Sequence, residues 1–261
     1  PWFAVAGKLP AEDILYLARH KRRTDGGVVI AVPRLPRIAN FDDLDPLAQE
    51  EGVELVLVAP GEAIPVCDLV LLPGSKSTIA DLAFLRGQGW DIDILAHRRR
   101  GGRVIGLCGG YQMLGRSIAD PDGVEGPAGR VEGLGLLDIE TVLTPDKAVR
   151  PFAGRDAEAG HDLEGYEIHL GRSDGPDRTR PWLLGNDGGE GAVSADGRVR
   201  GSYIHGLFAA DGFRHAFLAG LGAASAHGYE DGVEAALDAL ADHLEAHLDI
   251  DAIIRIAARG R

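Results

Sequence analysis

Short apolar runs alternate with helical patterns along the first half of the chain. Four such runs, each typical of a strand buried on both faces, occupy residues 28–32, 53–58, 68–72 and 103–107. Helical patterns lie between them, in an acidic stretch at 41–51 and in stretches that contain Ile79 and Ile92. Strands separated by helices predict a parallel sheet. The predicted fold class is therefore α/β, a doubly wound, flavodoxin-like, mostly parallel sheet with helices on both faces.

The pattern changes after Arg116. Residues 117–165 are rich in Gly, Pro and Asp, and the segment 134–143 within them has the composition of a strand. The segments 166–170 and 198–205 are also predicted to be strands. No internal repeat is visible, so these segments are expected to extend the same domain.

The two ends of the chain differ from its centre. Residues 1–26 hold a short helical pattern at 11–20 and then a polar, glycine-ended run, which predicts a linker into a main domain at 27–261. The only methionine is Met113, so either the first residue was removed or the chain is part of a longer polypeptide. The tail at 231–257 carries leucines at helical spacing, which predict a packing face: Leu237, Leu240, Leu244 and Leu248.

Composition excludes several classes of function. The formal net charge of −13 argues against a nucleic-acid groove, which needs clustered Lys and Arg. The two cysteines, Cys67 and Cys108, form no C-x-x-C pair, so neither a zinc site nor a disulfide framework is predicted. No apolar run approaches eighteen residues and no signal peptide opens the chain. We therefore expect no metal, no membrane insertion and a cytoplasmic location.

The most specific motif is Gly106-Leu107-Cys108-Gly109-Gly110. It has the form of the nucleophile elbow, a tight strand-to-helix turn, with Cys in the place of Ser. Small neighbours let the backbone make the turn, and the side chain then projects from the carboxyl edge of the sheet. The helix that follows offers free N–H groups and its positive dipole end, which favour a reactive thiolate. Cys108 is thus the predicted nucleophile, whereas Cys67 lacks such surroundings.

A thiolate that attacks a carbonyl needs donors for the developing oxyanion. The backbone N–H of Gly109 is one predicted donor, because it directly follows the nucleophile. The second is predicted at Gly74, in the loop that follows the strand at 68–72. A phosphate-binding loop at Gly74-Ser75-Lys76-Ser77 is disfavoured, because Val70 stands where the first glycine of that motif would be.

The base is predicted from the histidines that end or lie in strands. His205 ends a predicted strand and is followed by Gly206, so it has room around it and is the preferred base. His169 lies in mid-strand with Glu167 on the same face. Glu167 and His169 are therefore predicted to line the cleft.

Four motifs in this order resemble the class I glutamine amidotransferase domain of the cobyric acid synthase family. They are Leu71-Leu72-Pro73-Gly74-Ser75-Lys76-Ser77-Thr78, Gly106-Leu107-Cys108-Gly109-Gly110-Tyr111-Gln112-Met113-Leu114, Gly165-Tyr166-Glu167-Ile168-His169-Leu170-Gly171-Arg172 and Tyr203-Ile204-His205-Gly206-Leu207-Phe208. The resemblance covers roughly residues 27–256.

The resemblance implies that Cys108 hydrolyses L-glutamine through a γ-glutamyl thioester and releases ammonia. It implies that Gln112, with Tyr111, helps to hold the glutamine. It further implies an ATP-using synthetase domain upstream in the same polypeptide, which would bind ATP and Mg²⁺ and amidate carboxylates of cobyrinic acid a,c-diamide, a corrinoid bound at the domain interface. This domain itself would need no cofactor, and residues 1–26 would be the end of the upstream domain.

One position departs from the wider class. Many class I amidotransferases follow the histidine with Pro-Glu, whereas Gly206-Leu207 follows His205 here. The sequence therefore identifies no third member of a triad, and Glu167 is the fallback candidate. Two alternatives stay open: a stand-alone glutaminase subunit of lipid II amidation, which the Tyr166–His169 stretch fits less well, and a non-catalytic flavodoxin-like module.

Overall fold

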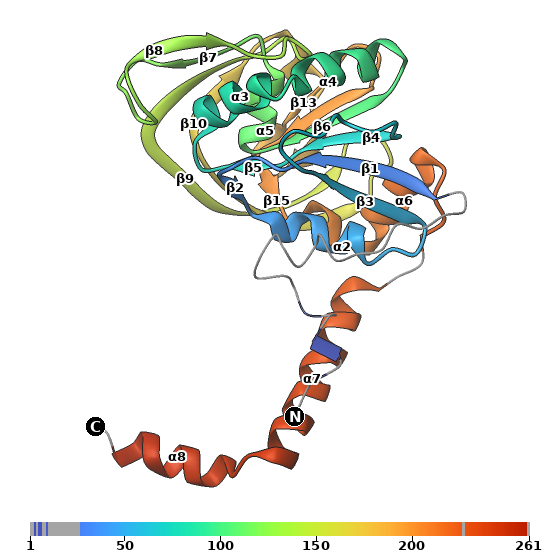
Figure 1. Ribbon diagram of the computed structural model, residues 1–261, viewed down its shortest axis with the longest axis vertical. Coiled ribbons are helices and arrows are strands. Elements are labelled where there is room, and N and C mark those ends of the chain that lie inside the picture. Colours follow the sequence, from blue (N-terminus) through green and yellow to red (C-terminus); the bar gives the residue numbers. More distant parts are fainter. Residues whose placement is uncertain (1–2, 4, 7–8, 10–26, 226–227, 260–261) are drawn as a thin grey trace.

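A computed structural model describes residues 3, 5–6, 9, 27–225 and 228–259. Figure 1 shows a rounded body from which two C-terminal helices extend. The predicted helix at 11–20 and most of the predicted linker at 1–26 lie outside the described residues. The body contains two large sheets, and the site described below lies where they meet.

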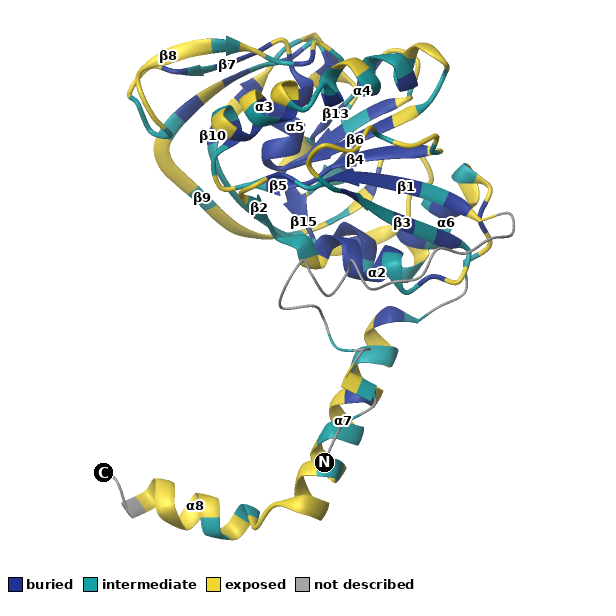
Figure 2. Ribbon diagram, in the orientation of Figure 1, coloured by how far each residue is buried: buried dark blue, intermediate teal, exposed yellow. Residues whose placement is uncertain are grey.

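The first sheet confirms the parallel core predicted from the sequence. Its strands run in the order β13-β14-β6-β4-β1-β3, and all neighbours are parallel except β13 and β14. Their bounds are Ala192–Val193 (β13), Val199–Ser202 (β14), Arg103–Leu107 (β6), Leu69–Leu72 (β4), Val28–Pro33 (β1) and Val53–Val58 (β3). All four predicted apolar runs are strands of this sheet, and Figure 2 shows that its central strands are mostly buried.

Helices cover both faces of this sheet, as predicted for a doubly wound fold (Figure 1). One face carries Thr78–Gly87 (α3), Trp90–Arg99 (α4) and Gly109–Leu114 (α5). The other carries Phe41–Leu44 (η2), Asp45–Ala48 (α2), Leu207–Ala209 (η4) and Asp211–Leu221 (α6). Each face has its own buried apolar cluster, one around Trp90 and the other around Phe208.

The second sheet is mainly antiparallel and is dominated by the long hairpin of β9 and β10. Its strands are Gly188–Glu190 (β12), Leu183–Gly185 (β11), Glu140–Asp156 (β9), Asp162–Asp174 (β10), Ile204–His205 (β15), Ser117–Asp120 (β7) and Gly129–Glu132 (β8). A 3-10 turn, Pro176–Thr179 (η3), follows β10. The predicted strand at 134–143 is mostly wrong, because β9 begins only at Glu140. The predicted strand at 198–205 is divided between β14 and β15.

A small third sheet connects two loops at the carboxyl edge of the first sheet. Ile38–Ala39 (β2) pairs with Gly74–Ser75 (β5), so that Ala39 lies opposite Gly74. The loop after β1 and the loop after β4 are thereby fixed to each other. This edge is where ligands of open α/β sheets bind.

The C-terminal tail forms Tyr229–His247 (α7) and Ile250–Arg259 (α8), which extend away from the body (Figure 1). The predicted packing face is covered only in part. Leu237, Leu244 and Leu248 are 44%, 39% and 48% exposed, and α8 is largely exposed in Figure 2. Tyr229 and Ala236, near the start of α7, are buried. The leucine pattern thus predicts the helix correctly but not its burial.

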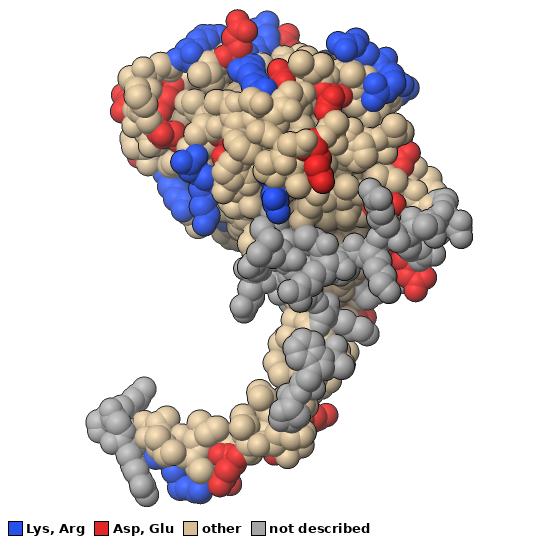
Figure 3. Space-filling view, viewed as in Figure 1, with Lys and Arg blue, Asp and Glu red and all other residues tan. Residues whose placement is uncertain are grey.

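The surface charge is dispersed. On the face shown in Figure 3, Lys and Arg side chains form separate groups with Asp and Glu between them, and no continuous basic track crosses the described residues there. Within the described part of the chain, no helix has both the length and the apolarity that crossing a bilayer requires.

Candidate active site

Cys108 lies on a strained turn between β6 and α5. Its backbone has φ 50° and ψ −110°, a conformation that L residues rarely adopt. The residue is buried, and its Sγ donates to the carbonyl oxygen of Ile168 at 3.5 Å. The backbone N–H of Cys108 bonds to the carbonyl oxygen of Ser202 on β14 at 2.8 Å. The turn therefore has the geometry that the Gly-x-Cys-x-Gly motif predicts.

The glycines around Cys108 are required by close backbone contacts. A Cβ added at Gly106 would lie 2.5 Å from the carbonyl oxygen of Gly110. A Cβ added at Gly110 would lie 2.2 Å from the carbonyl oxygen of Leu72. Contacts this short cannot be accommodated without moving the backbone. The two glycines let the start of α5 lie directly against β4 and β6, which sets the direction of the Cys108 side chain.

His205 is held by a carboxylate that the sequence did not single out. Its Nδ1 lies 2.6 Å from Oδ2 of Asp43, in η2, and both side chains are buried. The other oxygen of Asp43 accepts the backbone N–H of Gly206 at 2.7 Å. Because Asp43 takes the hydrogen on Nδ1, Nε2 is the ring atom left to exchange a proton. The sequence identified no third residue, and the structure places Asp43 in that position.

The imidazole of His205 interacts with Cys108 on its other side. Burial alone would lower the pKa of His205, but the hydrogen bond to Asp43, the closeness of the Cys108 thiol and the negative charge that each side chain can carry raise it to about 10. Nε2 is buried and has no hydrogen-bond partner within the described residues. The arrangement Asp43–His205–Cys108 can therefore hold a proton and deliver it beside the sulfur.

A second contact fixes the plane of the imidazole. The ring of Tyr166 stacks on that of His205, with centroids 5.3 Å apart and an interplanar angle of 26°. The Tyr166 hydroxyl accepts a hydrogen bond from the amide of Asn40 at 2.6 Å. Asn40 and Cys108 are the two non-glycine residues with positive φ in the described chain, and both lie at this site. Backbone strain is thus concentrated around Cys108 and His205.

Cys108 opens into a pocket of about 250 Å³. The pocket is lined by the small sheet, by β9 and β10 of the second large sheet, and by loops and helices that include the turn after β6: Ala39, Asn40, Ser75, Lys76, Thr78, Cys108, Gln112, Glu125, Lys147, Ile168, His169 and Leu170. His169 is placed in the cleft, as predicted. Its ring stacks on Tyr203 with centroids 3.6 Å apart.

Gln112 and Tyr111, both predicted to hold glutamine, have different surroundings. Gln112 lines the pocket, but its amide nitrogen donates to Leu170 and Tyr203 and its amide oxygen accepts from Thr78. Both amide hydrogens are therefore committed to binding the two sheets together. The Tyr111 ring is buried behind α5, against Tyr203 and Gly201, and is not in the lining of this pocket. The prediction for Tyr111 is wrong because its side chain is on the core face of the helix.

Glu167 does not support His205. Its carboxylate contacts Nε2 of His169 at 2.5 Å and pairs with Arg150 at 2.8 Å. It lines an adjoining, larger cavity of about 800 Å³, which shares His169 and Lys147 with the Cys108 pocket. The fallback role of Glu167 as the third residue is therefore corrected in favour of Asp43.

The two predicted oxyanion donors lie at the site. Gly109 is the first residue of α5, where N–H groups have no partner within the helix. A Cβ at Gly109 would lie 2.9 Å from the backbone nitrogen of Ser75, and a Cβ at Gly74 would lie 3.4 Å from Cε1 of His205. The loop after β4 therefore passes close to both the nucleophile turn and the base. Their roles as donors stay a prediction.

The other cysteine also has a histidine neighbour. Sγ of Cys67 lies 3.8 Å from Nδ1 of His97, whose Nε2 bonds to the carbonyl oxygen of Arg103 at 2.9 Å. Burial, followed by the charge of Asp68, raises the pKa of the Cys67 thiol to about 11. Cys67 is thus poorly suited to be a nucleophile at neutral pH.

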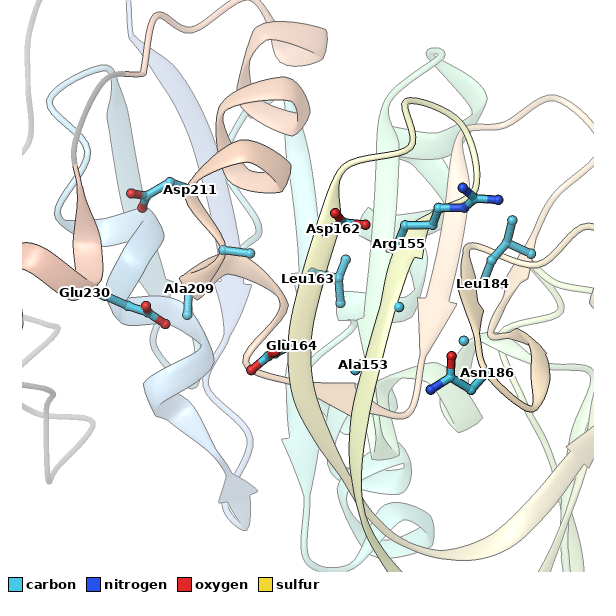
Figure 4. Close-up of a pocket in the computed structure, with 13 residues that line it drawn as sticks. Ala153, Arg155, Asp162, Leu163, Glu164, Leu184, Asn186, Ala209, Asp211 and Glu230 are labelled. Atoms are coloured by element: carbon cyan, nitrogen blue, oxygen red, sulfur yellow. The ribbon is translucent and has the colours of Figure 1, made fainter.

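Another large cavity lies away from Cys108. Figure 4 shows a pocket of about 750 Å³ beside the β9–β10 hairpin, with Asp162, Glu164, Asp211 and Glu230 around it. It contains neither Cys108 nor His205.

On α7, His243 and His247 are spaced one helical turn apart and stack with centroids 4.5 Å apart. Within the described residues, no three His, Cys, Asp or Glu side chains are grouped to hold a metal ion.

Comparison with protein families supports the motifs on which this site is built. Residues 29–213 match the model of the CobB/CobQ-like glutamine amidotransferase domain. The chain is 62% identical over 259 residues to a cobyric acid synthase of Rhodobacter capsulatus, and 60% identical over 259 residues to one of Bradyrhizobium diazoefficiens. Each alignment covers 98% of this chain and 53% of the relative, so the chain spans about half the length of these relatives.

Solved structures share the fold at much lower sequence identity. A structure described as a glutamine amidotransferase aligns with a TM-score of 0.53 at 17% identity, over 75% of this chain and 98% of the other. The structure of PurLQS from Thermotoga maritima aligns with a TM-score of 0.51 at 15% identity, over 84% and 99%. At this identity the likeness bears on the fold alone, and it agrees with the predicted α/β class.

Proposed function

This chain belongs to the CobB/CobQ-like glutamine amidotransferase family, and from that premise we propose that it hydrolyses L-glutamine through a thioester on Cys108. The observation that carries the proposal is the buried series Asp43–His205–Cys108, with the cysteine on a turn of positive φ. Such a series can activate a sulfur nucleophile and then protonate a poor leaving group.

In the first half of the reaction, Nε2 of His205 takes the thiol proton of Cys108, and Sγ attacks the side-chain amide carbon of glutamine. The S–C bond forms while the carbonyl π pair moves to the oxygen, where the N–H groups of Gly109 and Gly74 are the proposed donors. His205, which the Asp43 carboxylate keeps oriented, delivers a proton from Nε2 to the amide nitrogen. The C–N bond then breaks, and ammonia leaves behind a γ-glutamyl thioester.

In the second half, water replaces ammonia. His205, now neutral, takes a proton from the attacking water, and the C–S bond breaks to give glutamate. The sum is glutamine and water converted to glutamate and ammonia. Gln112 contributes by tying Thr78, beside the oxyanion loop, to Leu170 on the opposite wall of the pocket.

We further propose that the ammonia is passed to an ATP-using half of a longer polypeptide, the half that would bind ATP and Mg²⁺. There it would amidate carboxylates of a cobyrinic acid a,c-diamide corrinoid in cobalamin biosynthesis. Support comes from relatives of 62% and 60% identity that are named cobyric acid synthase and are nearly twice as long. ATP-dependent amide formation from glutamine by a polypeptide with both halves would test this part.

Labelling with a diazo-ketone analogue of glutamine tests the glutaminase chemistry directly. We expect one adduct per chain, located at Cys108 by peptide mass spectrometry and blocked by excess L-glutamine. The Cys108→Ala variant should take up no label, whereas Cys67→Ala should be labelled like the unmodified chain. Equal labelling of Cys108→Ala would contradict the proposal and favour a non-catalytic module.

A further inference from the structure

The pocket beside Cys108 contains charges that the reaction itself does not use. Lys76, Glu125 and Lys147 line it together with the nucleophile. Free glutamine carries an ammonium and a carboxylate on its α carbon, and both need counter-charges when they leave bulk water. A pocket of about 250 Å³ places any such counter-charges close to the reacting amide.

Hydrogen bonds anchor Glu125 in the pocket wall. Buried Asp120, at the end of β7, accepts the backbone N–H of Val124 at 2.7 Å and that of Glu125 at 2.9 Å, which folds the loop back on itself. Oε2 of Glu125 accepts the N–H of Ile79, in the first turn of α3, at 3.0 Å. Oε1 makes no hydrogen bond to any residue that the structure describes. One carboxylate oxygen is thus anchored while the other remains available to a ligand.

The two lysines supply the positive charge. Lys147 lies on β9 opposite Leu170 of β10, whose carbonyl oxygen receives the amide of Gln112. Lys76 lies in the turn between β5 and α3. Both side chains are exposed, and neither ammonium forms an ion pair with a described residue. In a chain with a net charge of −13, two cations without carboxylate partners at the nucleophile pocket are available to an anionic ligand.

We propose that Glu125 binds the α-ammonium group of the substrate and that Lys147, with Lys76, binds its α-carboxylate. The pocket would then select free glutamine as a zwitterion and reject amides that lack either charge. This inference rests on the proposed glutaminase function and specifies how that site recognises its substrate. A simpler role for Glu125, as a cap for the first turn of α3, makes a different prediction: its loss would affect stability but not selectivity.

Paired substrates separate these roles in the full 261-residue chain. Glutaramate lacks the α-amino group of glutamine, and 4-aminobutanamide lacks its α-carboxylate. In Glu125→Gln we expect the KM for L-glutamine to rise about 10-fold to 100-fold, because a charge-assisted hydrogen bond is lost, with kcat within about threefold. The KM for glutaramate should be unchanged. In Lys147→Met the KM should rise for L-glutamine and stay constant for 4-aminobutanamide.

Controls keep the result interpretable. Glutamine at position 125 retains an oxygen for the N–H of Ile79, so the fold should be kept, and the thermal midpoint verifies this. Glu132→Gln, on the exposed face of β8, should match the unmodified chain in all three KM values. Calorimetric binding of L-glutamine to Cys108→Ala, with and without Glu125→Gln, gives the same comparison independently of turnover.

The outcomes are distinguishable. Equal changes in KM for L-glutamine and glutaramate in Glu125→Gln would overturn the inference and leave the glutaminase function standing, as would unchanged KM values with a lower thermal midpoint. A chain that neither hydrolyses L-glutamine nor binds it as Cys108→Ala would overturn the proposed function, and this inference with it.

Discussion

Two cysteine–histidine pairs occur among the residues that the structure describes, and they have opposite electrostatic surroundings. Cys108 lies beside His205, whose far nitrogen is bonded to the buried carboxylate of Asp43. Cys67 lies beside His97, whose far nitrogen is bonded only to a backbone carbonyl oxygen. The pKa of His205 is raised to about 10, whereas burial, together with the nearby charges of arginines, lowers the pKa of His97.

The comparison shows that proximity alone does not give a cysteine and a histidine the electrostatics that proton transfer needs. An imidazole can accept a proton and keep it only if something stabilises the resulting positive charge. Asp43 provides this for His205, while Arg98 and Arg100 oppose it at His97. The two pairs therefore differ in the charged residues that surround each histidine on the side away from the cysteine. Variants of these residues should differ in their effects, from the largest to the smallest.

Removing the negative charge of Asp43, which contacts His205, should have the largest effect on glutamine hydrolysis. We expect Asp43→Asn to lower kcat/KM for glutamine hydrolysis by about 10²-fold to 10⁴-fold, because the amide cannot stabilise the imidazolium or enforce its tautomer. Asp68→Asn, which alters the carboxylate nearest Cys67, is the matched control and should change kcat/KM by less than about twofold. A glutamate-release assay measures both. Similar activity in the two variants would show that Asp43 is dispensable.

The pH dependence of stability should separate the two histidines next. The folded pKa of His205, about 10, is above its ordinary value of 6.5. Its contribution to stability is therefore complete below about pH 6.5 and is lost as the pH rises toward 10. In urea titrations, the difference in unfolding free energy between the unmodified chain and His205→Gln should narrow over this range, by about 1.4 kcal/mol for each unit of pKa shift.

His97 should show the opposite trend. Because its folded pKa is lowered, its contribution is present above about pH 6.5 and is lost as the pH falls. The difference in unfolding free energy between the unmodified chain and His97→Gln should therefore narrow only as the pH falls below about 6.5. If the difference in unfolding free energy between the unmodified chain and His205→Gln stays constant between pH 6.5 and 10, the raised pKa of His205 is refuted.

Replacing the second cysteine should have the smallest effect. Cys67→Ala removes a half-buried thiol whose raised pKa, about 11, keeps it protonated at neutral pH. We expect kcat/KM within about twofold of the unmodified chain and a loss of about 1 kcal/mol or less in unfolding free energy. Kinetic assays and urea titration measure these values. A large loss of activity would mean that the Cys67–His97 pair has a role that its electrostatics do not indicate.

The nucleophile side of the site could be predicted from the sequence because its constraints are local. Gly106 and Gly110 flank Cys108 within five residues, and each is needed for a backbone contact of that turn. The parallel strands were equally accessible, because burial on both faces leaves a continuous apolar run. His205 followed from its place at the end of a strand, next to a glycine.

Asp43 could not be predicted in this way. It is 162 positions from His205, and three acidic residues, Asp42, Asp43 and Asp45, stand close together in the same short segment. Only the packing of η2 against the end of β15 distinguishes them. Asn40, whose left-handed backbone opens that segment, is a signal that could have drawn attention to it.

The predicted strand at 166–170 lies within β10, but most of the β9–β10 hairpin was missed, for a different reason. Much of β9 is exposed, and it contains Pro145 and Pro151, which are unusual inside a strand. Its apolar alternation is therefore weak, and the tertiary pairing with β10 decides its structure. The wall that β10 contributes to the Cys108 pocket was therefore only partly foreseen, at Glu167 and His169.

The positive φ of Cys108 also bears on how tolerant the fold is of change. Holding a non-glycine residue in that conformation costs roughly 1–3 kcal/mol, which the surrounding contacts must offset. A cysteine kept at this position for its thiol therefore lowers the stability of the fold relative to glycine. In a duplicated copy that no longer needs the thiol, substitution of Cys108 by glycine would be favoured. The resulting protein would be more stable but would lack the thiol nucleophile.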